Sequence, residues 1–174
     1  MIRKAVEKDL KDILEIHRLA FNEEDEAELV DQLLIDPTAQ PCLSLVGEQD
    51  GQIVAHILFT KASVDSTSAY LLAPLAVHPD VQYKGWGKRL INAGLKSLKK
   101  MGVDLVFVLG DPNYYPRSGF QCNAGALGFP TPQPIPAQYN EAWMVQELRD
   151  GVIGQAKGTV NVADAIAPIE FWSE

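Results

Sequence analysis

Apolar residues recur at helical spacing in the first part of the chain. They predict one helix over residues 9–21 and a second from about 25 to 35, joined by the acidic connector 22–26. Asp9 and Asp12 would lie near the positive end of the first helix. Asp36-Pro37 ends the second helix, because proline cannot extend a helix and restricts the residue before it.

Shorter apolar runs follow, and they predict strands. Residues 42–46 and 53–60 are strand-like and flank a turn at 49–51, which indicates a hairpin. A polar link, 63–68, leads to a third strand over 70–77. Pro74 lies inside that strand, and a proline there predicts a bulge or a place where ladder pairing is given up.

The pattern returns to helical spacing over 86–101, where Lys99 and Lys100 suit the negative end and Gly102 suits the C-terminal cap. The continuous apolar run 105–109 is typical of a strand covered on both faces. Strand, loop, helix and strand together predict a right-handed crossover between parallel strands. In the tail, 129–137 is proline-rich and expected to be extended, 141–148 is expected to be a strand, and a last strand is expected beyond it.

Composition narrows the class of protein. A chain of 174 residues, 47% of them hydrophobic, can bury one sizeable core, so we expect a single domain over 1–174 with a motif-bearing core over about 1–150. No apolar run is long enough for a membrane span, and the scattered charge of the first ten residues predicts no secretory signal. Two cysteines give no disulfide framework, which favours the cytoplasm. A net charge of −8 argues against a nucleic-acid partner and fits a cationic or neutral small molecule.

The segment 77–89 carries the clearest chemistry. A strand ends, a loop holds Gly85 and Gly87, and a helix begins at once. Free N–H groups at a helix start form an anion site, and glycine lets the backbone approach a ligand closely. Lys84, Lys88 and Arg89 add positive charge in an acidic protein. The segment therefore predicts a phosphate-bearing ligand, and the alternative is a basic turn that caps an ordinary helix.

Two common nucleotide motifs do not fit this loop. A Walker A loop requires glycine where Gln82 stands and Ser or Thr where Arg89 stands. A Rossmann fingerprint requires a small residue where Leu90 stands. The phosphate ligand is therefore expected to be held by another kind of loop.

Residues 82–87, Gln-Tyr-Lys-Gly-Trp-Gly, resemble the Gln/Arg-x-x-Gly-x-Gly/Ala signature of the GNAT superfamily of N-acetyltransferases. Residues 75–79 resemble that family's fourth strand and its exit, and Arg3-Lys4-Ala5 with Asp9 and Ile13 resemble its first strand and helix. Residues 115–120 resemble its Tyr-x-x-x-Gly-Phe element. The resemblance covers residues 1 to about 120. Residues 109–112 and 142–145 look most like the YhbS-type branch.

The resemblance implies an α/β (α+β, mixed-sheet) fold, with a mostly antiparallel central sheet, one parallel strand–helix–strand crossover and flanking helices. It implies acetyl-CoA as co-substrate, with no metal. The pyrophosphate would lie on the signature loop, and the main chain of Leu75 and Val77 would pair with the pantetheine arm. The cofactor-binding residues so implied are Leu75, Ala76, Val77, Gln82, Tyr83, Lys84, Gly85, Trp86, Gly87, Lys88 and Arg89.

The chemistry that the resemblance implies is direct attack of a neutral amine on the acetyl thioester. Tyr115 takes the place of the family's general acid, and Tyr114 is the adjacent rival; both could instead simply pack against the sheet. A phenol can protonate a thiolate as it leaves, and a backbone N–H near Val77 would stabilise the oxyanion. Pro116, directly after Tyr115, is expected to shorten the helix that bears it.

The general base is left unassigned by the sequence. His78 lies near the strand end and is read as solvated, whereas His17 and His56 are read as structural. The acidic residues of 23–28 lie where the family forms its acceptor site, and they are either an ammonium site or a solvated surface. The spacing of His and Cys predicts no metal site.

Three other functions remain open beside an acetyltransferase. A catalytically inactive CoA-binding module would keep the fold, an enzyme of the same fold could use a longer acyl-CoA, and the proline-rich segment could bind a protein. That segment lacks PxxP spacing. The acceptor is expected to be an amine on a small molecule or peptide, and a homodimer is compatible with the sequence without being indicated by any pattern.

Overall fold

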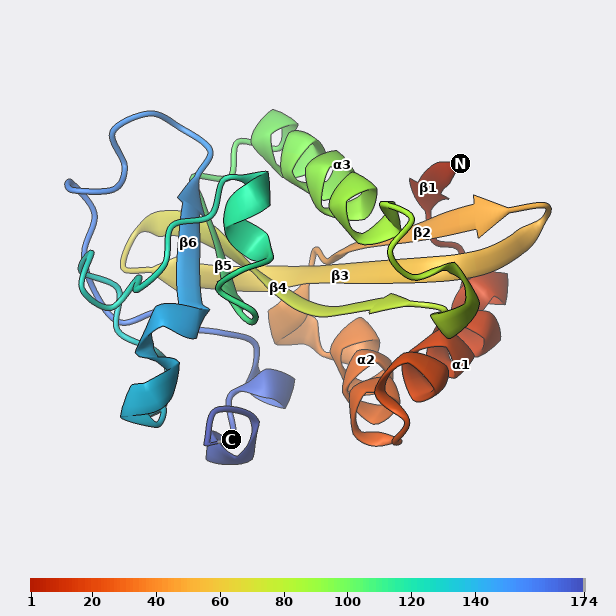
Figure 1. Ribbon diagram of the computed structural model, residues 1–174. Helices are drawn as coiled ribbons and strands as arrows, with labels where there is room; N and C mark the ends of the chain where they lie inside the picture. Colours follow the sequence, from red (N-terminus) through yellow and green to blue (C-terminus); the bar gives the residue numbers. More distant parts are fainter. Residues whose placement is uncertain (174) are drawn as a thin grey trace.

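The computed structural model describes residues 1–173, and its centre is a six-stranded sheet in the order β1-β2-β3-β4-β5-β6 (Figure 1). Neighbouring strands are antiparallel except β4 and β5, which are parallel. This confirms the mixed sheet and the single parallel crossover. The strands are β1 (Ile2–Lys4), β2 (Leu43–Gln49), β3 (Gln52–Val64), β4 (Thr67–Val77), β5 (Leu105–Leu109) and β6 (Trp143–Glu147).

Within residues 1–173, three α-helices cover the two faces of the sheet. Helices α1 (Leu10–Phe21) and α2 (Asp25–Ile35) lie on one face, and α3 (Trp86–Lys100), which connects β4 to β5, lies on the other (Figure 1). All three were predicted to within one residue at each end. Asp36 ends α2 in an extended conformation before Pro37, as the sequence indicated.

Alternating strand residues supply two separate cores. On β3, Leu58 and Val64 face α1 and α2, whereas Ile57 and Phe59 face α3. This alternation places each large side chain on a defined face, since successive strand residues point to opposite sides. The first core also holds Trp143 and Trp172, whose rings pack edge to face with centroids 5.5 Å apart.

Strands β3 and β4 are longer than the sequence indicated. The predicted polar link 63–68 is wrong, because Ser63 pairs with Ser68 and only residues 65–66 form the turn. Val64 is buried while Ser68 is exposed. The serines therefore occupy the outward positions of a hairpin rather than a loop.

The expected terminal strand is also wrong. From Arg149 to Ser173 the structure contains short 3₁₀ helices, Asp164–Ile166 and Ile169–Phe171, and bridges that involve single residues. The proline-rich 129–137 forms neither helix nor strand before the 3₁₀ helix that begins at Ala137. Prolines and glycines in this part of the chain disfavour continuous ladder pairing. No helix within residues 1–173 has the length and apolar character that crossing a membrane requires.

Candidate functional site

The parallel strands β4 and β5 separate halfway along their length. Their pairing ends at Leu71 and Phe107, although β4 continues to Val77. On the other side, the register with β3 shifts between Leu72 and Leu75, so that Ala73 and Pro74 form a bulge. The bulge predicted from Pro74 is confirmed, and it lies where the two strands begin to splay.

The end of β4 turns free backbone groups toward this splay. The His78 N–H donates to the Val54 carbonyl at 2.7 Å, so residues 54 and 78 are a hydrogen-bonded pair. Because such pairs alternate in antiparallel ladders, the N–H and C=O groups of Leu75 and Val77 point away from β3. The Gln82 amide donates to the Val77 carbonyl at 3.2 Å, which agrees with that direction. The Ala76 backbone, by contrast, faces β3.

Helix α3 begins directly beside the end of β4. Its first helical bond joins the Arg89 N–H to the Gly85 carbonyl at 3.1 Å, so the N–H groups of residues 86–88 have no acceptor within the helix. Gly85 has φ +87°, a conformation that favours glycine and lets the loop turn into the helix. These free N–H groups and the helix dipole are the features from which the sequence predicted an anion site, and they could bind an anion.

A cavity of about 660 Å³, the loop cavity, lies between this helix start and the segment after β5. Lys88 and Arg117 give it positive charge. Of the residues implied by the GNAT resemblance, its lining includes Leu75, Ala76, Val77, Gln82, Tyr83, Gly85, Trp86, Gly87 and Lys88.

Lys84, Arg89 and Tyr115 do not line the loop cavity. The Arg89 guanidinium lies 4.5 Å from the centroid of the Trp86 ring. Trp86 itself is buried and packs on β2, where a Cβ at Gly47 would lie 2.6 Å from its ring. Trp86 therefore anchors α3 to the sheet as well as lining the cavity. Tyr83, in contrast, is fully exposed.

A second cavity of about 450 Å³, the splay cavity, fills the gap between the ends of β4 and β5. It adjoins the loop cavity through shared lining residues, Phe21, Leu75, Asp111 and Tyr114. Its wall also includes the bulge residues Ala73 and Pro74. The two cavities thus form one passage along the unpaired edge of β4.

The two candidate tyrosines occupy different places in this passage. Tyr115 begins the 3₁₀ helix Tyr115–Ser118, lines the splay cavity, and packs edge to face on Phe120 with centroids 5.8 Å apart. Tyr114 lines both cavities. Burial raises the pKa of both phenols, and nearby Tyr114 and Asp111 raise that of Tyr115 further. Both side chains therefore hold their protons at neutral pH.

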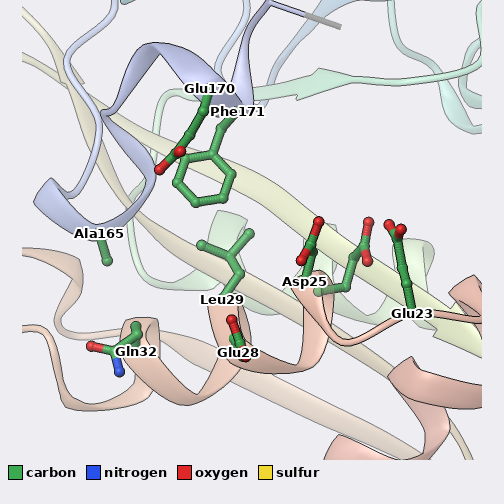
Figure 2. A pocket seen from close by; sticks show the side chains of 9 residues that line it. Glu23, Asp25, Glu28, Leu29, Gln32, Ala165, Glu170 and Phe171 are labelled. Atoms are coloured by element: carbon green, nitrogen blue, oxygen red, sulfur yellow. The ribbon is translucent and has the colours of Figure 1, made fainter.

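A third cavity of about 580 Å³, the acidic cavity, opens beyond the splay cavity (Figure 2). Four acidic residues of 23–28 and Glu170 line it, and Figure 2 shows Phe171 of the C-terminal segment facing Leu29 of α2. Glu26, Leu29 and Phe171 line both this cavity and the splay cavity. The acidic connector thus borders a hollow that is continuous with the passage, as the acceptor-site hypothesis requires.

The sequence did not single out several lining residues. Phe21, Asp111, Asn113, Arg117 and Ser118 line the loop cavity. Arg117 lies within the Tyr-x-x-x-Gly-Phe element, so its positive charge was a signal that could have identified it. Phe171 and Trp172 come from the far end of the chain, and no local pattern marks them.

The three histidines lie outside these cavities. His17 and His56 are buried on α1 and β3, with His17 Nε2 2.8 Å from His56 Nδ1, and Ser44 Oγ lies 2.8 Å from His56 Nε2. His78 Nδ1 accepts the Asp80 N–H at 3.1 Å and caps a short turn. Within residues 1–173, no group of three or more His, Cys, Asp or Glu side chains is placed to hold a metal ion.

Comparison with known proteins gives a consistent result. The family model described as the acetyltransferase (GNAT) family matches residues 10–120. The chain is 47% identical over 144 residues to the uncharacterised N-acetyltransferase YjhQ of Escherichia coli (strain K12), which covers 80% of each chain. It is 33% identical over 127 residues to the uncharacterised N-acetyltransferase YhbS of the same strain, covering 71% of this chain and 75% of YhbS.

Solved structures agree with the sequence matches. The crystal structure of YhbS from Escherichia coli in complex with CoA superposes with a TM-score of 0.87 and 29% identity, over 97% of this chain and 92% of that one. A GNAT family acetyltransferase from Brucella melitensis in complex with acetyl-CoA superposes with a TM-score of 0.75 and 29% identity, over 95% and 97% of the two chains. The expected resemblance, including its YhbS-type branch, is confirmed.

Proposed function

The chain belongs to the GNAT family of acetyl-CoA-dependent acetyltransferases, and on this premise we propose that it transfers the acetyl group to a primary amine by direct attack on the thioester. The observation that carries the proposal is the unpaired edge of β4, which runs from the anion site of α3 into the splay cavity. A ligand with phosphates at one end and amide groups along an arm matches that edge.

The loop cavity fits the phosphate end of acetyl-CoA. The free N–H groups of residues 86–88 would bind the pyrophosphate, and Lys88 and Arg117 would supply opposite charge. Gln82 and Gly85 shape the loop, while Lys84 and Arg89 would contribute at longer range. Tyr83, fully exposed beside this cavity, offers a face on which a base could stack.

The β4 edge fits the pantetheine arm. The N–H and C=O groups of Leu75 and Val77 point into the passage and would pair with the amides of the arm, as an added strand does. Such pairing would bring the thioester near the bulge at Pro74, in the splay cavity. Because Val77 lies three residues from Pro74 and its N–H would pair with the arm, a free backbone N–H at the bulge, rather than the one near Val77 expected from the sequence, would stabilise the oxyanion that forms when the amine attacks.

Tyr115 is proposed as the general acid. Its side chain lines the splay cavity, and its raised pKa keeps the phenol protonated until a thiolate develops. A proton donor positioned in this way contributes about 10²–10⁴-fold to the rate. Tyr114 lines both cavities, and its hydroxyl lies against Gly87 at the helix start.

Direct attack is favoured over a covalent acetyl-enzyme because of where the thiols lie. Within residues 1–173, neither Cys42 nor Cys122 lines any of the three cavities. Burial raises the pKa of the Cys42 thiol, which makes it a poor nucleophile. A thioester in the splay cavity would therefore meet the amine before it met a thiolate.

Steady-state kinetics test this proposal. CoA release is followed while acetyl-CoA and a set of primary amines are varied, and the protein is weighed by mass spectrometry after exposure to acetyl-CoA alone. We expect intersecting double-reciprocal lines and no acetylated protein. Parallel lines with an acetylated cysteine would contradict direct attack. Acetyl-CoA binding without turnover of any amine would favour the inactive CoA-binding module instead.

A further inference from the structure

Direct attack requires an acceptor amine without its extra proton. Alkyl amines have pKa values near ~10, so only about one molecule in 10³ is neutral at pH 7. An ammonium group cannot attack a carbonyl carbon until it loses a proton. A group in the passage that accepts this proton would therefore raise the rate, and neither tyrosine can do so while it holds its own proton.

Glu26 lies at the junction through which an acceptor would reach the thioester. Only Glu26, Leu29 and Phe171 are shared by the acidic and splay cavities among residues 1–173, and the other two side chains are apolar. The Glu26 carboxyl is thus the single titratable group that borders both the outer hollow and the gap beside the β4 bulge.

The Glu26 side chain also has unused hydrogen-bonding capacity. Its Oε2 atom is buried and has no hydrogen-bond partner within the described residues. A buried carboxylate oxygen without a donor is costly, and an ammonium N–H in the cavity would satisfy it. Asp111, the other carboxylate of the splay cavity, is exposed and already accepts the Asn113 N–H at 2.8 Å.

If the proposed function holds, we propose that the Glu26 carboxylate accepts the proton that the acceptor ammonium must lose before it attacks the thioester. The cavity at the phosphate end carries Lys88 and Arg117, whereas the acidic and splay cavities have no basic side chain among their described lining residues. This division of charge directs phosphates to one end of the passage and an ammonium to the other.

The groups around Glu26 increase its basicity. Burial raises its pKa first, its own backbone N–H partly opposes this, and the charge and nearby carboxyl of Glu23 and the charge of Asp25 raise it further. Across the cavities it faces Glu28 of its own helix, Glu170 of the C-terminal segment, and Asp111, Tyr114 and Tyr115 of the segment after β5. None of these side chains is a cation. A carboxylate with a raised pKa is the stronger base for this step.

The protons balance in this step. The ammonium gives its first proton to Glu26, the neutral nitrogen forms the C–N bond, and the C–S bond breaks. Tyr115 gives its proton to the thiolate and is restored by the second proton that the nitrogen loses. Glu26 then releases its proton to water, so that one proton is released for each amide and CoA thiol formed.

The test compares Glu26→Gln with Asp31→Asn, an exposed carboxylate on the same helix that lines none of the three cavities. Spermidine is the amine, because its charge suits the acidic cavity, and CoA release is measured from pH 6.5 to 9.5. We expect Glu26→Gln to bind acetyl-CoA as the wild type does but to lose about 10²-fold in kcat/KM at pH 7. This loss should shrink as the pH approaches the pKa of the free amine, because more of the amine is then already neutral.

An unchanged rate or a parallel pH profile in Glu26→Gln would overturn the proposal, and the same loss in Asp111→Asn alone would assign the role to Asp111. If the wild type binds acetyl-CoA but leaves spermidine unmodified, a ¹³C NMR titration of the glutamate carboxyls measures the pKa of Glu26 and tests the proposal in that way. A Glu26 pKa no higher than the average of the other glutamates overturns the proposal, and a higher one supports it. Wild-type protein that does not bind acetyl-CoA would instead refute the proposed function.

Discussion

At the scale of single residues, the Tyr114 hydroxyl lies against the backbone of Gly87 at the start of α3. A Cβ on residue 87 would overlap that oxygen, whereas it would lie 3.4 Å from the ring carbon Cζ, an ordinary contact. The absence of a side chain at Gly87 therefore keeps both the tyrosine and the helix N–H groups in place. The glycine of the signature loop is needed here for space.

Gly87→Ala should weaken acetyl-CoA binding about 10- to 100-fold, in line with the ~1–3 kcal/mol typical of overpacking. Adding Tyr114→Phe should restore most of the affinity, because it removes the overlapping oxygen. Calorimetric titration of the wild type, both single variants and the double variant measures this. A double variant that binds as weakly as Gly87→Ala would show that Tyr114 is not the obstacle.

Tyr115→Phe tests the role of the phenol in the splay cavity. We expect kcat to fall about 10²-fold while acetyl-CoA affinity stays within twofold, because the ring still packs on Phe120 and only the proton donor is lost. Tyr114→Phe serves as the paired variant, with kcat within a few-fold of wild type. The opposite order of effects would transfer the general-acid role to Tyr114.

At the scale of elements, local patterns predicted the parts of the site that lie close together in sequence. Pro74 predicted the bulge in β4, and Gly85 predicted the loop that opens α3, because each reflects a backbone constraint within a few residues. Gly87 belonged to the same motif, but its requirement for space comes from Tyr114. The pairing of His17 with His56 was not predicted, since it joins α1 to β3 across 39 positions. The prediction that His17 and His56 have a structural rather than a catalytic role is nonetheless consistent with their burial.

The buried histidine pair makes the stability of the fold depend on pH. Burial lowers the pKa of His17 to about 4 and lowers that of His56 well below its usual value. The unfolded chain therefore binds more protons than the folded one between about pH 6.5 and 4. Stability is full above pH 6.5 and is lost as the pH falls through this window.

The free energy of unfolding should fall by about 3 kcal/mol for His17 between pH 6.5 and 4, at ~1.4 kcal/mol per pKa unit. Urea unfolding at several pH values measures it. The double variant His17→Leu/His56→Leu should lose most of this slope, whereas His78→Gln, which changes a partly exposed histidine, should keep it. An equal slope in the double variant would show that other groups cause the loss.

At the scale of the whole molecule, the C-terminal segment completes the acidic and splay cavities. The Asp36 carboxylate at the end of α2 accepts the Ala165 N–H at 2.9 Å, and Thr38 Oγ1 accepts the Asp164 N–H at 2.8 Å. The segment then places Glu170, Phe171 and Trp172 over α2 and the splay. These contacts span more than 120 positions, so the sequence alone could not reveal this wall.

Asp36→Ala should release the C-terminal segment, because it removes the acceptor for Ala165 and for the Thr38 N–H and hydroxyl. We expect a loss of about 1–3 kcal/mol in stability. Hydrogen exchange of residues 164–172 should be faster, while exchange in α3 is unchanged. Unchanged protection of 164–172 would show that packing of Trp172, rather than Asp36, holds the segment.

The net charge of −8 does not show how positive and negative side chains are distributed along the passage. The positive side chains Lys88 and Arg117 border the loop cavity at one end of the passage, and the acidic residues border the other end. The sequence predicted the charge of Lys88 from the loop motif and suggested the acidic end from the acidic connector, but it did not single out Arg117. It could not predict that the two ends join through the splay, because that depends on how β4, β5 and the C-terminal segment pack.

Calorimetric titration of the CoA-stripped protein with acetyl-CoA examines the passage most directly. Gly87→Glu places a carboxylate at the helix N–H groups, and Asn92→Glu adds the same charge at an exposed position of α3 as its control. We predict saturable binding by the wild type and by Asn92→Glu, and none by Gly87→Glu. Folded wild-type protein that does not bind acetyl-CoA, or a Gly87→Glu variant that binds it normally, would contradict the assignment of the loop and splay cavities to this co-substrate.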